Sequence, residues 1–269
     1  MSDLDVAVLG IGAWSPQWTD WNSAAATLCG NVDIASNDTA RPAPAILPPT
    51  ERRRAPESVL LGVDVALQAC TMAAIAPSEL AHVFASSYGE LAISDYLCET
   101  LAKAPLEVSP IRFHNSVHNA PAGYWAIAAG CTRSSTAISA GDSTFGAGLL
   151  ETALTVNSNA SPALLSVYDV PATGPLRDVV ACSTKFGVGF VLGPDQPNAV
   201  ARLRIRRAAD SKPTELASVA SVLHAVHREN PAARSLALLQ AIARKESGAI
   251  RIAAGPRLML DVEILPWAM

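Results

Sequence analysis

The order of predicted elements along the chain constrains its fold most strongly. Short apolar runs rich in β-branched residues alternate with longer segments whose apolar residues recur at helical spacing. We predict strands over residues 5–11, 81–87, 134–139, 162–168, 187–192, 199–206 and 257–265. We predict helices over residues 18–29, 57–74, 93–104, 119–130, 142–157, 214–228 and 232–244. Strands that alternate with helices form a sheet covered on both faces, so this order predicts an α/β fold with a largely parallel buried sheet.

Two local features refine this prediction. The segment between the runs at 187–192 and 199–206 contains Gly193-Pro194, which favours an antiparallel hairpin. Near residue 209 the alternation gives way to two consecutive helices. We therefore divide the chain into a domain over residues 1–208 and a short C-terminal remainder over residues 209–269 that packs on the same core.

The composition excludes several classes of protein. Half of the 269 residues are hydrophobic and 16% are charged, which excludes a disordered chain. The net charge is −4 and no basic stripe is present, so we expect no nucleic-acid partner. The N-terminus lacks the pattern of a secretory signal, and no apolar run is long enough to span a bilayer. We therefore expect a cytoplasmic protein.

Cofactor and metal signals are weak. The five cysteines are odd in number and form no C-x-x-C pair, which predicts free, buried thiols rather than a zinc site or a disulfide framework. Gly10-Ile11-Gly12 lacks the third glycine of a dinucleotide fingerprint. We expect neither a cofactor nor a bound metal.

The most informative segment is a predicted strand, turn and helix in the middle of the chain. The strand at 134–139 leads into Ala140-Gly141-Asp142, and a helix of small residues follows. A turn of this shape is a nucleophile elbow, which presents one side chain at a helix N-terminus, where free N–H groups stabilise negative charge. Asp142 is the residue that this turn presents.

The surrounding motifs resemble those of the β-ketoacyl-ACP synthases. Asn119, Ala122, Gly123 and Tyr124 match the N-x-x-A-G-H helix motif of that family, with tyrosine in place of histidine. The LPPTERRRAPE segment at 47–57 is similar to the family's L-P-x-x-x-R-R approach to a helix, and residues 187–193 are similar to its G-F-V-x-G motif. The resemblance covers residues 4–206. It is strongest to the ketosynthase-like subset with the signature F-H-N-S-V-H-N-x-x-A-G-Y-W, which occurs in aryl polyene-type pathways and resembles chain-length factors.

The resemblance implies half of a thiolase-like fold, with a mixed, mainly parallel five-stranded sheet. A gap-free count from Asn119 places Asp142 at the family's nucleophilic cysteine, and a small insertion would move that position to Ser139 or Ser143. None of the three supplies the thiolate that attacks an acyl thioester. His224 and His227 match neither of the family's two catalytic histidines, and we interpret them as surface or packing residues. We therefore expect no catalytic residue.

The resemblance also implies partners. Ketosynthases dimerise through the strand that precedes the elbow, which is 134–139 here, and an exposed edge strand needs a partner. We predict a heterodimer with a full-length ketosynthase, access to an acyl carrier protein through that complex, and completion of an acyl tunnel. The interface or tunnel candidates are Phe113, His114, Asn115, Ser116, His118 and Asn119.

Two alternatives remain open. Gly141-Asp142-Ser143 spells the start of a G-D-S esterase motif, with Ser143 as an alternative nucleophile. That motif normally lies on the first strand and ends in D-x-x-H, which this chain lacks. The other alternative is a homodimeric scaffold.

Overall fold

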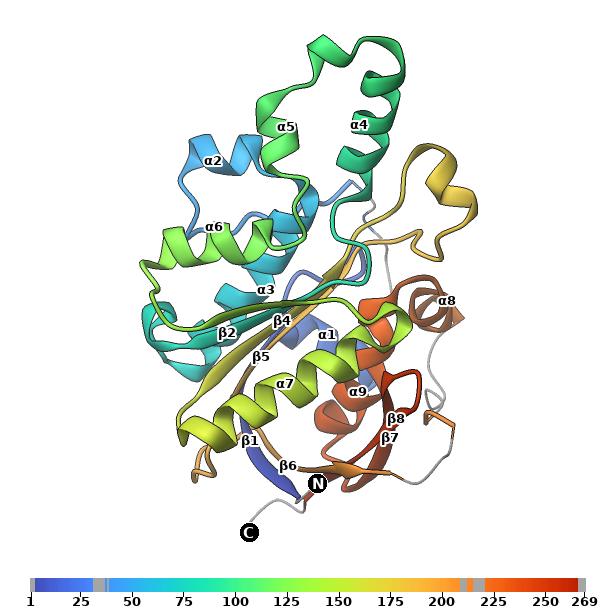
Figure 1. Cartoon of the computed structure of the whole chain (residues 1–269). Coiled ribbons are helices and arrows are strands. Elements are labelled where there is room, and N and C mark those ends of the chain that lie inside the picture. Colours follow the sequence, from blue (N-terminus) through green and yellow to red (C-terminus); the bar gives the residue numbers. More distant parts are fainter. Residues whose placement is uncertain (1–2, 31–36, 38, 209–211, 215–220, 266–269) are drawn as a thin grey trace.

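The computed structural model describes residues 3–30, 37, 39–208, 212–214 and 221–265, and within residues 221–224 it describes the side chain of Leu223 alone. It shows one mixed sheet flanked by helices (Figure 1). The predicted α/β class is therefore confirmed. The α-helices are α1 (Trp21–Leu28), α2 (Pro49–Arg54), α3 (Glu57–Ala73), α4 (Leu91–Lys103), α5 (Pro110–His114), α6 (Ala120–Ala129), α7 (Thr144–Asn159), α8 (Ser221–Glu229) and α9 (Leu236–Arg244).

The sheet has eight strands in the order β3-β2-β4-β5-β1-β6-β8-β7. Their bounds are β1 (Leu4–Trp14), β2 (Ala81–Ala85), β3 (Ser135–Ile138), β4 (Ala163–Asp169), β5 (Phe186–Gly193), β6 (Ala201–Arg207), β7 (Gly248–Gly255) and β8 (Leu258–Ile264). The prediction of five strands is wrong, because β6, β8 and β7 continue the same sheet beyond β1. The prediction of a mainly parallel sheet is also wrong. Only β2 pairs in parallel, with β3 and β4, and the other described pairings are antiparallel.

The predicted hairpin of β5 and β6 is wrong as well, because β1 lies between them and pairs with both. Glycines explain why β1 and β5 are neighbours under α3. A Cβ on Gly12 of β1 or on Gly189 of β5 would lie 2.2 Å from the Val65 carbonyl oxygen of α3. Because these positions carry no side chain, the backbone of α3 can pack directly against both strands.

Some helix boundaries also differ from the prediction. The helix expected over residues 214–228 begins at Ser221 in the described part, and residues 215–220 lie outside it. The helices expected over 142–157 and 232–244 each open with a 3-10 turn, η3 (Gly141–Ser143) and η5 (Pro231–Ser235). The domain boundary predicted at residues 208 and 209 falls where residues 209–211 lie outside the described residues.

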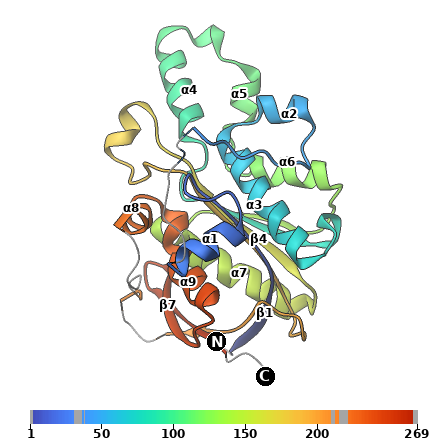
Figure 2. The same ribbon diagram turned by 180° about the vertical axis from the view of Figure 1, so that it is seen from behind.

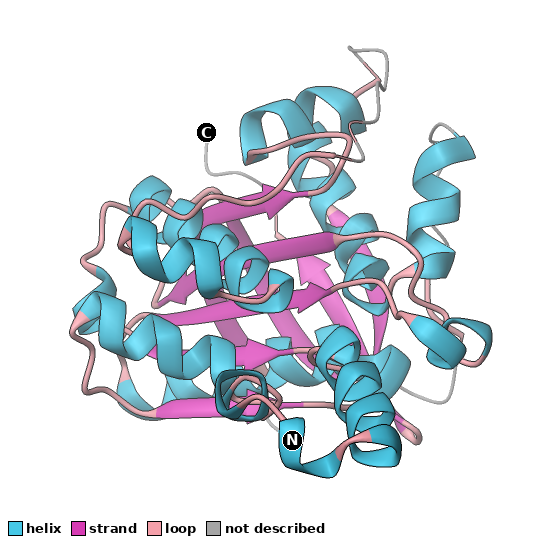
Figure 3. Ribbon diagram, turned by 90° about the horizontal axis from the view of Figure 1, so that it is seen from above, coloured by secondary structure: helices cyan, strands magenta, loops and turns pink. Residues whose placement is uncertain are grey.

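Two apolar cores lie on opposite faces of the sheet. One contains side chains of α3 and α6, and the other contains side chains of α1, α7 and α9. Figures 2 and 3 show the helices on the two faces of the sheet from behind and from above. Helix α7 packs on β2 near one edge of the sheet and on β7 at the other edge, so the sheet curls around it. A Cβ on Gly146 would lie 2.1 Å from the Ala253 carbonyl oxygen, which shows how closely α7 approaches β7.

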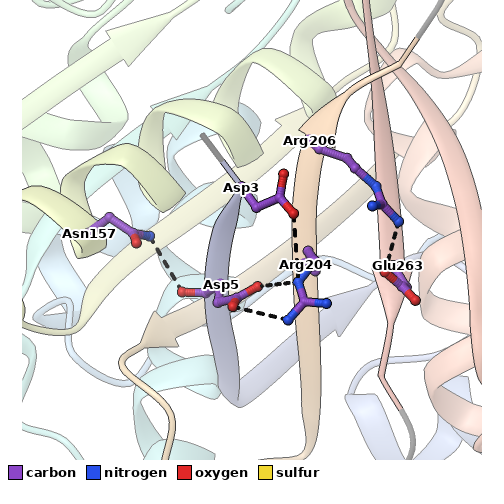
Figure 4. A network of polar contacts seen from close by, with 6 residues as sticks. All are labelled: Asp3, Asp5, Asn157, Arg204, Arg206 and Glu263. Carbon is purple, nitrogen blue, oxygen red and sulfur yellow. Dashed lines mark hydrogen bonds and ion pairs between the residues drawn. The ribbon is translucent and has the colours of Figure 1, made fainter. Parts of the chain in front are cut away.

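The outward side chains of the antiparallel half are charged and paired (Figure 4). Arg204 on β6 contacts Asp5 on β1, with 2.9 Å from its Nε to Oδ1, and Arg206 contacts Glu263 on β8 at 2.9 Å. Cross-strand pairs of opposite charge suit a face that stays in water. Among the described residues, no helix is both long and apolar enough to cross a membrane, and no group of His, Cys, Asp and Glu could hold a metal ion.

Candidate functional site

The elbow is a short turn between β3 and α7. Strand β3 ends at Ile138, and Gly141 adopts the left-handed conformation with φ of +55°, which a glycine tolerates without strain. The hydroxyl of Thr144 donates to the Gly141 carbonyl oxygen at 2.7 Å and accepts from the Ala140 N–H at 2.9 Å. This local bonding turns Asp142 outward, and 71% of its side chain is exposed.

A buried polar cluster supports the elbow from below. The Ser87 hydroxyl donates to the Gly141 carbonyl oxygen at 2.7 Å, and Ser139 donates to the Ser87 carbonyl oxygen at 2.9 Å. Asp169, at the end of β4, accepts from the Ser86 hydroxyl at 2.8 Å and from the Ser87 N–H at 2.9 Å. Burial raises the pKa of the Asp169 carboxyl to about 7, although these donors oppose the shift. The cluster explains how the loop after β2 fixes the elbow.

The residue that faces Asp142 comes from the C-terminal remainder. Arg234 in η5 lies 3.8 Å from the Asp142 carboxylate, measured from its Nη2. Both residues line a cavity of about 390 Å³ together with His227 and residues of β7. The sequence carries no local motif that would have indicated Arg234 or this cavity, because they are assembled from segments far apart in the chain.

The alternative nucleophile, Ser143, is the last residue of η3 and directly precedes α7. The backbone N–H of Ser143 donates to the Ala140 carbonyl oxygen at 3.1 Å. None of the hydrogen bonds among the described residues joins its hydroxyl to a histidine. A serine without a partner that takes its proton is a weak nucleophile, so the geometry gives the esterase alternative no support.

The second part of the site is the open edge of the sheet. Strand β3 is the terminal strand, and its burial alternates between exposed and half-buried residues. Large apolar side chains are exposed in the segment that precedes it: Phe113 of α5 is 64% exposed, Val117 51%, and Ile127 of α6, the helix that contacts β3, 86%. We call β3 with these three residues the open-edge surface. A cavity of about 560 Å³ lies between α6 and residues 46–51, and its largely apolar lining includes Val117, Ile127 and Tyr124.

The six predicted interface residues divide into two groups. Phe113, His114 and Asn119 are exposed, and His114 and Asn119 line the 560 Å³ cavity. The other three hold the segment in place. Asn115 is buried and accepts from the Tyr124 hydroxyl at 3.2 Å, His118 Nε2 donates to the Ser86 carbonyl oxygen at 2.8 Å, and Ser116 donates to the Phe113 carbonyl oxygen at 2.8 Å.

The sheet curls around α7 and the elbow lies at the start of this helix, which is the arrangement of a thiolase-like fold. Residues 18–253 match the family model of the β-ketoacyl synthase N-terminal domain, and the chain belongs to this family. No curated protein matches the chain.

Several solved structures are similar to it. One is a ketosynthase (ApeO) in complex with its chain length factor (ApeC) from Xenorhabdus doucetiae, with 20% identity, a TM-score of 0.70, and coverage of 97% of this chain and 99% of that chain. Another is the ishigamide ketosynthase/chain length factor, with 16% identity, a TM-score of 0.67, and coverage of 98% and 99%. A third is AntDE:AntF, a type II PKS acyl-carrier protein in complex with its ketosynthase, with 11% identity, a TM-score of 0.71, and coverage of 98% and 100%. At these identities the likeness shows the fold.

Proposed function

We propose that the chain is a non-catalytic, chain-length-factor-like subunit that pairs with a full-length β-ketoacyl-ACP synthase in polyene or fatty-acid-type chain elongation. The observation that carries this proposal is an intact elbow that presents Asp142. The turn keeps its left-handed glycine and its hydroxyl bonds, so the scaffold of a nucleophile is present without a thiol.

The chemistry of the elbow argues against condensation by this chain alone. Acyl transfer from a thioester needs a nucleophile that forms an acyl-enzyme of similar energy, and a thiolate does this at neutral pH. A carboxylate at Asp142 would form a mixed anhydride, which lies uphill from a thioester. The exposed position of Asp142 beside Arg234 suits a solvated carboxylate instead.

The open-edge surface supports pairing with a second protein. The carbonyl oxygens of Ser134 and Ile138 accept from the N–H groups of His82 in β2 and of Ser86 directly after it. The alternate residues Ser135 and Ala137 therefore direct their N–H and C=O groups away from β2. An unpaired strand edge bordered by exposed Ile127 and Val117 is unfavourable in water. A partner strand would satisfy the edge and bury the apolar side chains together.

The 560 Å³ cavity extends the proposal to the substrate. Its apolar lining includes Val117 and Ile127 of the open-edge surface, so a partner that covers these two side chains would cover part of the cavity. We infer that the covered cavity accommodates part of a growing acyl chain, which an acyl carrier protein delivers to the partner's active site. The similar structures named above include ketosynthases with a chain length factor or an acyl-carrier protein, which supports this reading.

Co-expression with a full-length ketosynthase from the same genome tests the proposal. We expect the two chains to co-elute in size-exclusion chromatography and condensation to require both chains. The isolated chain should form no acyl adduct with an acyl thioester, as measured by mass spectrometry. Separate elution, together with full activity of the ketosynthase alone, would contradict the proposal.

A further inference from the structure

The cavity beside Asp142 combines an apolar wall with a basic rim. Its volume is about 390 Å³, and five parts of the chain form it: the elbow, residues 212–214, His227 of α8, the η5–α9 region and β7. The apolar lining residues are Pro213, Ala237, Ile250, Ile252 and Ala253. The charged lining residues are Lys212, Arg234, Arg251 and Asp142. A pocket with this lining suits an amphiphilic small molecule.

The cavity is positively charged in a chain whose net charge is −4. Three fixed cations face one carboxylate there. Arg251 forms an ion pair with Asp261, with 3.2 Å from its Nε to Oδ1. Lys212 and Arg234 are therefore the main cations that face the cavity. Among the ion pairs of the described residues, none includes Lys212. Like charges in a hollow lined by apolar side chains attract an oppositely charged group.

Arg234 is held in place for such a group. Its Nη1 donates to the His227 carbonyl oxygen at 2.7 Å and approaches His227 Nδ1 at 3.3 Å. Its Nη2 lies 3.8 Å from the Asp142 carboxylate, which is too long for a hydrogen bond. The guanidinium is therefore fixed by one side while donors on its other side stay available for a planar or tetrahedral anion.

We propose that this cavity binds a small organic anion, a carboxylate or a phosphate monoester on a short apolar stem. Arg234 and Lys212 hold the charged group, and the side chains of β7 and α9 hold the stem. Asp142 lowers the affinity, because its charge repels the anion and competes for Arg234. The proposal uses residues of this chain and does not rest on the proposed pairing with a ketosynthase.

Calorimetric titration of the full chain with hexanoate, hexyl phosphate and 1-hexanol tests this site. We expect saturable binding of at least one of the two anions, and binding of the neutral alcohol at least about tenfold weaker, since hydrogen bonds to a charged group account for a tenfold difference. The tighter of the two anions distinguishes the carboxylate source from the phosphate source. Absence of saturable anion binding, or equal binding of hexanol, would overturn the proposal.

Variants then locate the binding. Arg234→Ala and Lys212→Ala should each weaken anion binding, by about tenfold for the placed arginine. Asp142→Asn should strengthen it by several-fold. Arg133→Ala removes an exposed arginine at the opposite end of β3 and should leave the affinity unchanged. The exposed side chains of Lys212 and Asp142 can be changed without disturbing the core, so unchanged affinity in both variants would overturn the proposal.

Discussion

The two edge strands of the sheet, β7 and β3, differ in what lies beside them. At one edge, residues 212–214 cover β7: the Thr214 N–H donates to the Arg251 carbonyl oxygen at 3.0 Å, and the Arg251 N–H donates to the Thr214 hydroxyl at 2.8 Å. At the other edge, the outward N–H and C=O groups of β3 have no strand beside them in the described part of the chain. Among the described residues, the chain therefore bonds to the middle of one edge strand and leaves the other edge strand open.

The side chains around the two edges differ in the same way. The antiparallel half that leads to β7 carries paired charges on its outward face, such as Arg206 with Glu263. The open-edge surface carries exposed Ile127, Val117 and Phe113. Natural sheets protect exposed edges with charges and covering segments, and the described residues place neither on β3, which agrees with the proposed pairing.

The largest effect is expected from a charge on the open-edge surface. Ile127→Asp should abolish detectable pairing with the ketosynthase, weakening it at least about a hundredfold, because an unpaired buried carboxylate costs several kcal/mol. Binding measured by biolayer interferometry checks this. Val179→Asp is the matched control, because Val179 is 78% exposed and lies on the β4–β5 connection outside that surface. Equal loss in both variants would remove the distinction between the two regions.

A proline in each edge strand compares the edges directly. Ala137→Pro removes an outward N–H of β3 while the bonds to β2 remain, and proline is tolerated on such an edge. The partner's carbonyl then stays unsatisfied, so affinity should fall at least about tenfold. Ala249→Pro places the same change on the side of β7 that faces Thr214 and should leave pairing intact. Circular dichroism checks that both variants fold.

The buried carboxyl of Asp169 should make the stability of the folded chain depend on pH. Burial raises the pKa of Asp169 to about 7, well above its value in an unfolded chain. The folded state therefore retains a proton that the unfolded state releases, so the free energy of unfolding should fall as the pH rises from about 4 to about 7, by at most about 1.4 kcal/mol per pH unit for this group. Urea denaturation across this range measures the slope.

Asp169→Asn provides the control for that slope. The variant should flatten the pH dependence in part, because burial also raises the pKa of Asp64, to about 6. The slope is measured on the isolated chain, so the flattening does not depend on pairing. An unaltered slope would show that Asp169 is ionised in the folded state at pH 5.

The smallest effect is expected at the covered edge. Thr214→Val removes the hydroxyl that accepts from the Arg251 N–H. Because both residues are exposed, water replaces the lost bond, and the free energy of unfolding should fall by only about 0.5 to 1 kcal/mol. Pairing with the ketosynthase should not change. A loss of pairing in this variant would place the interface at β7.

Local patterns in the sequence predicted most helices and strands. They could not predict which strands pair when those strands lie far apart in the sequence. The strand at β1 and the helix at α3 follow from spacing within a few residues. Strand β7 was missed because its GAIRIAAG sequence is rich in glycine and alanine, a weak strand signal. The hairpin of β5 and β6 was wrong because both strands pair with β1, which lies far away in the sequence.

The site divides in the same manner. The elbow at Asp142 could be predicted, because strand, glycine and helix follow one another directly in the chain. The cavity that joins Asp142 to Lys212 and Arg234 could not, because it depends on how the C-terminal remainder folds back onto α7. The equivalence of Asp142 to the family's cysteine remains a prediction.

Hydrogen–deuterium exchange measures whether a full-length ketosynthase pairs with this chain at β3. The amides of Ser135 and Ala137 face outward, so they should exchange rapidly in the isolated chain and become protected when a full-length ketosynthase is added. The amides of β7 should exchange at the same rate in both samples. If a complex forms while the amides of Ser135 and Ala137 still exchange rapidly, the ketosynthase does not pair at β3.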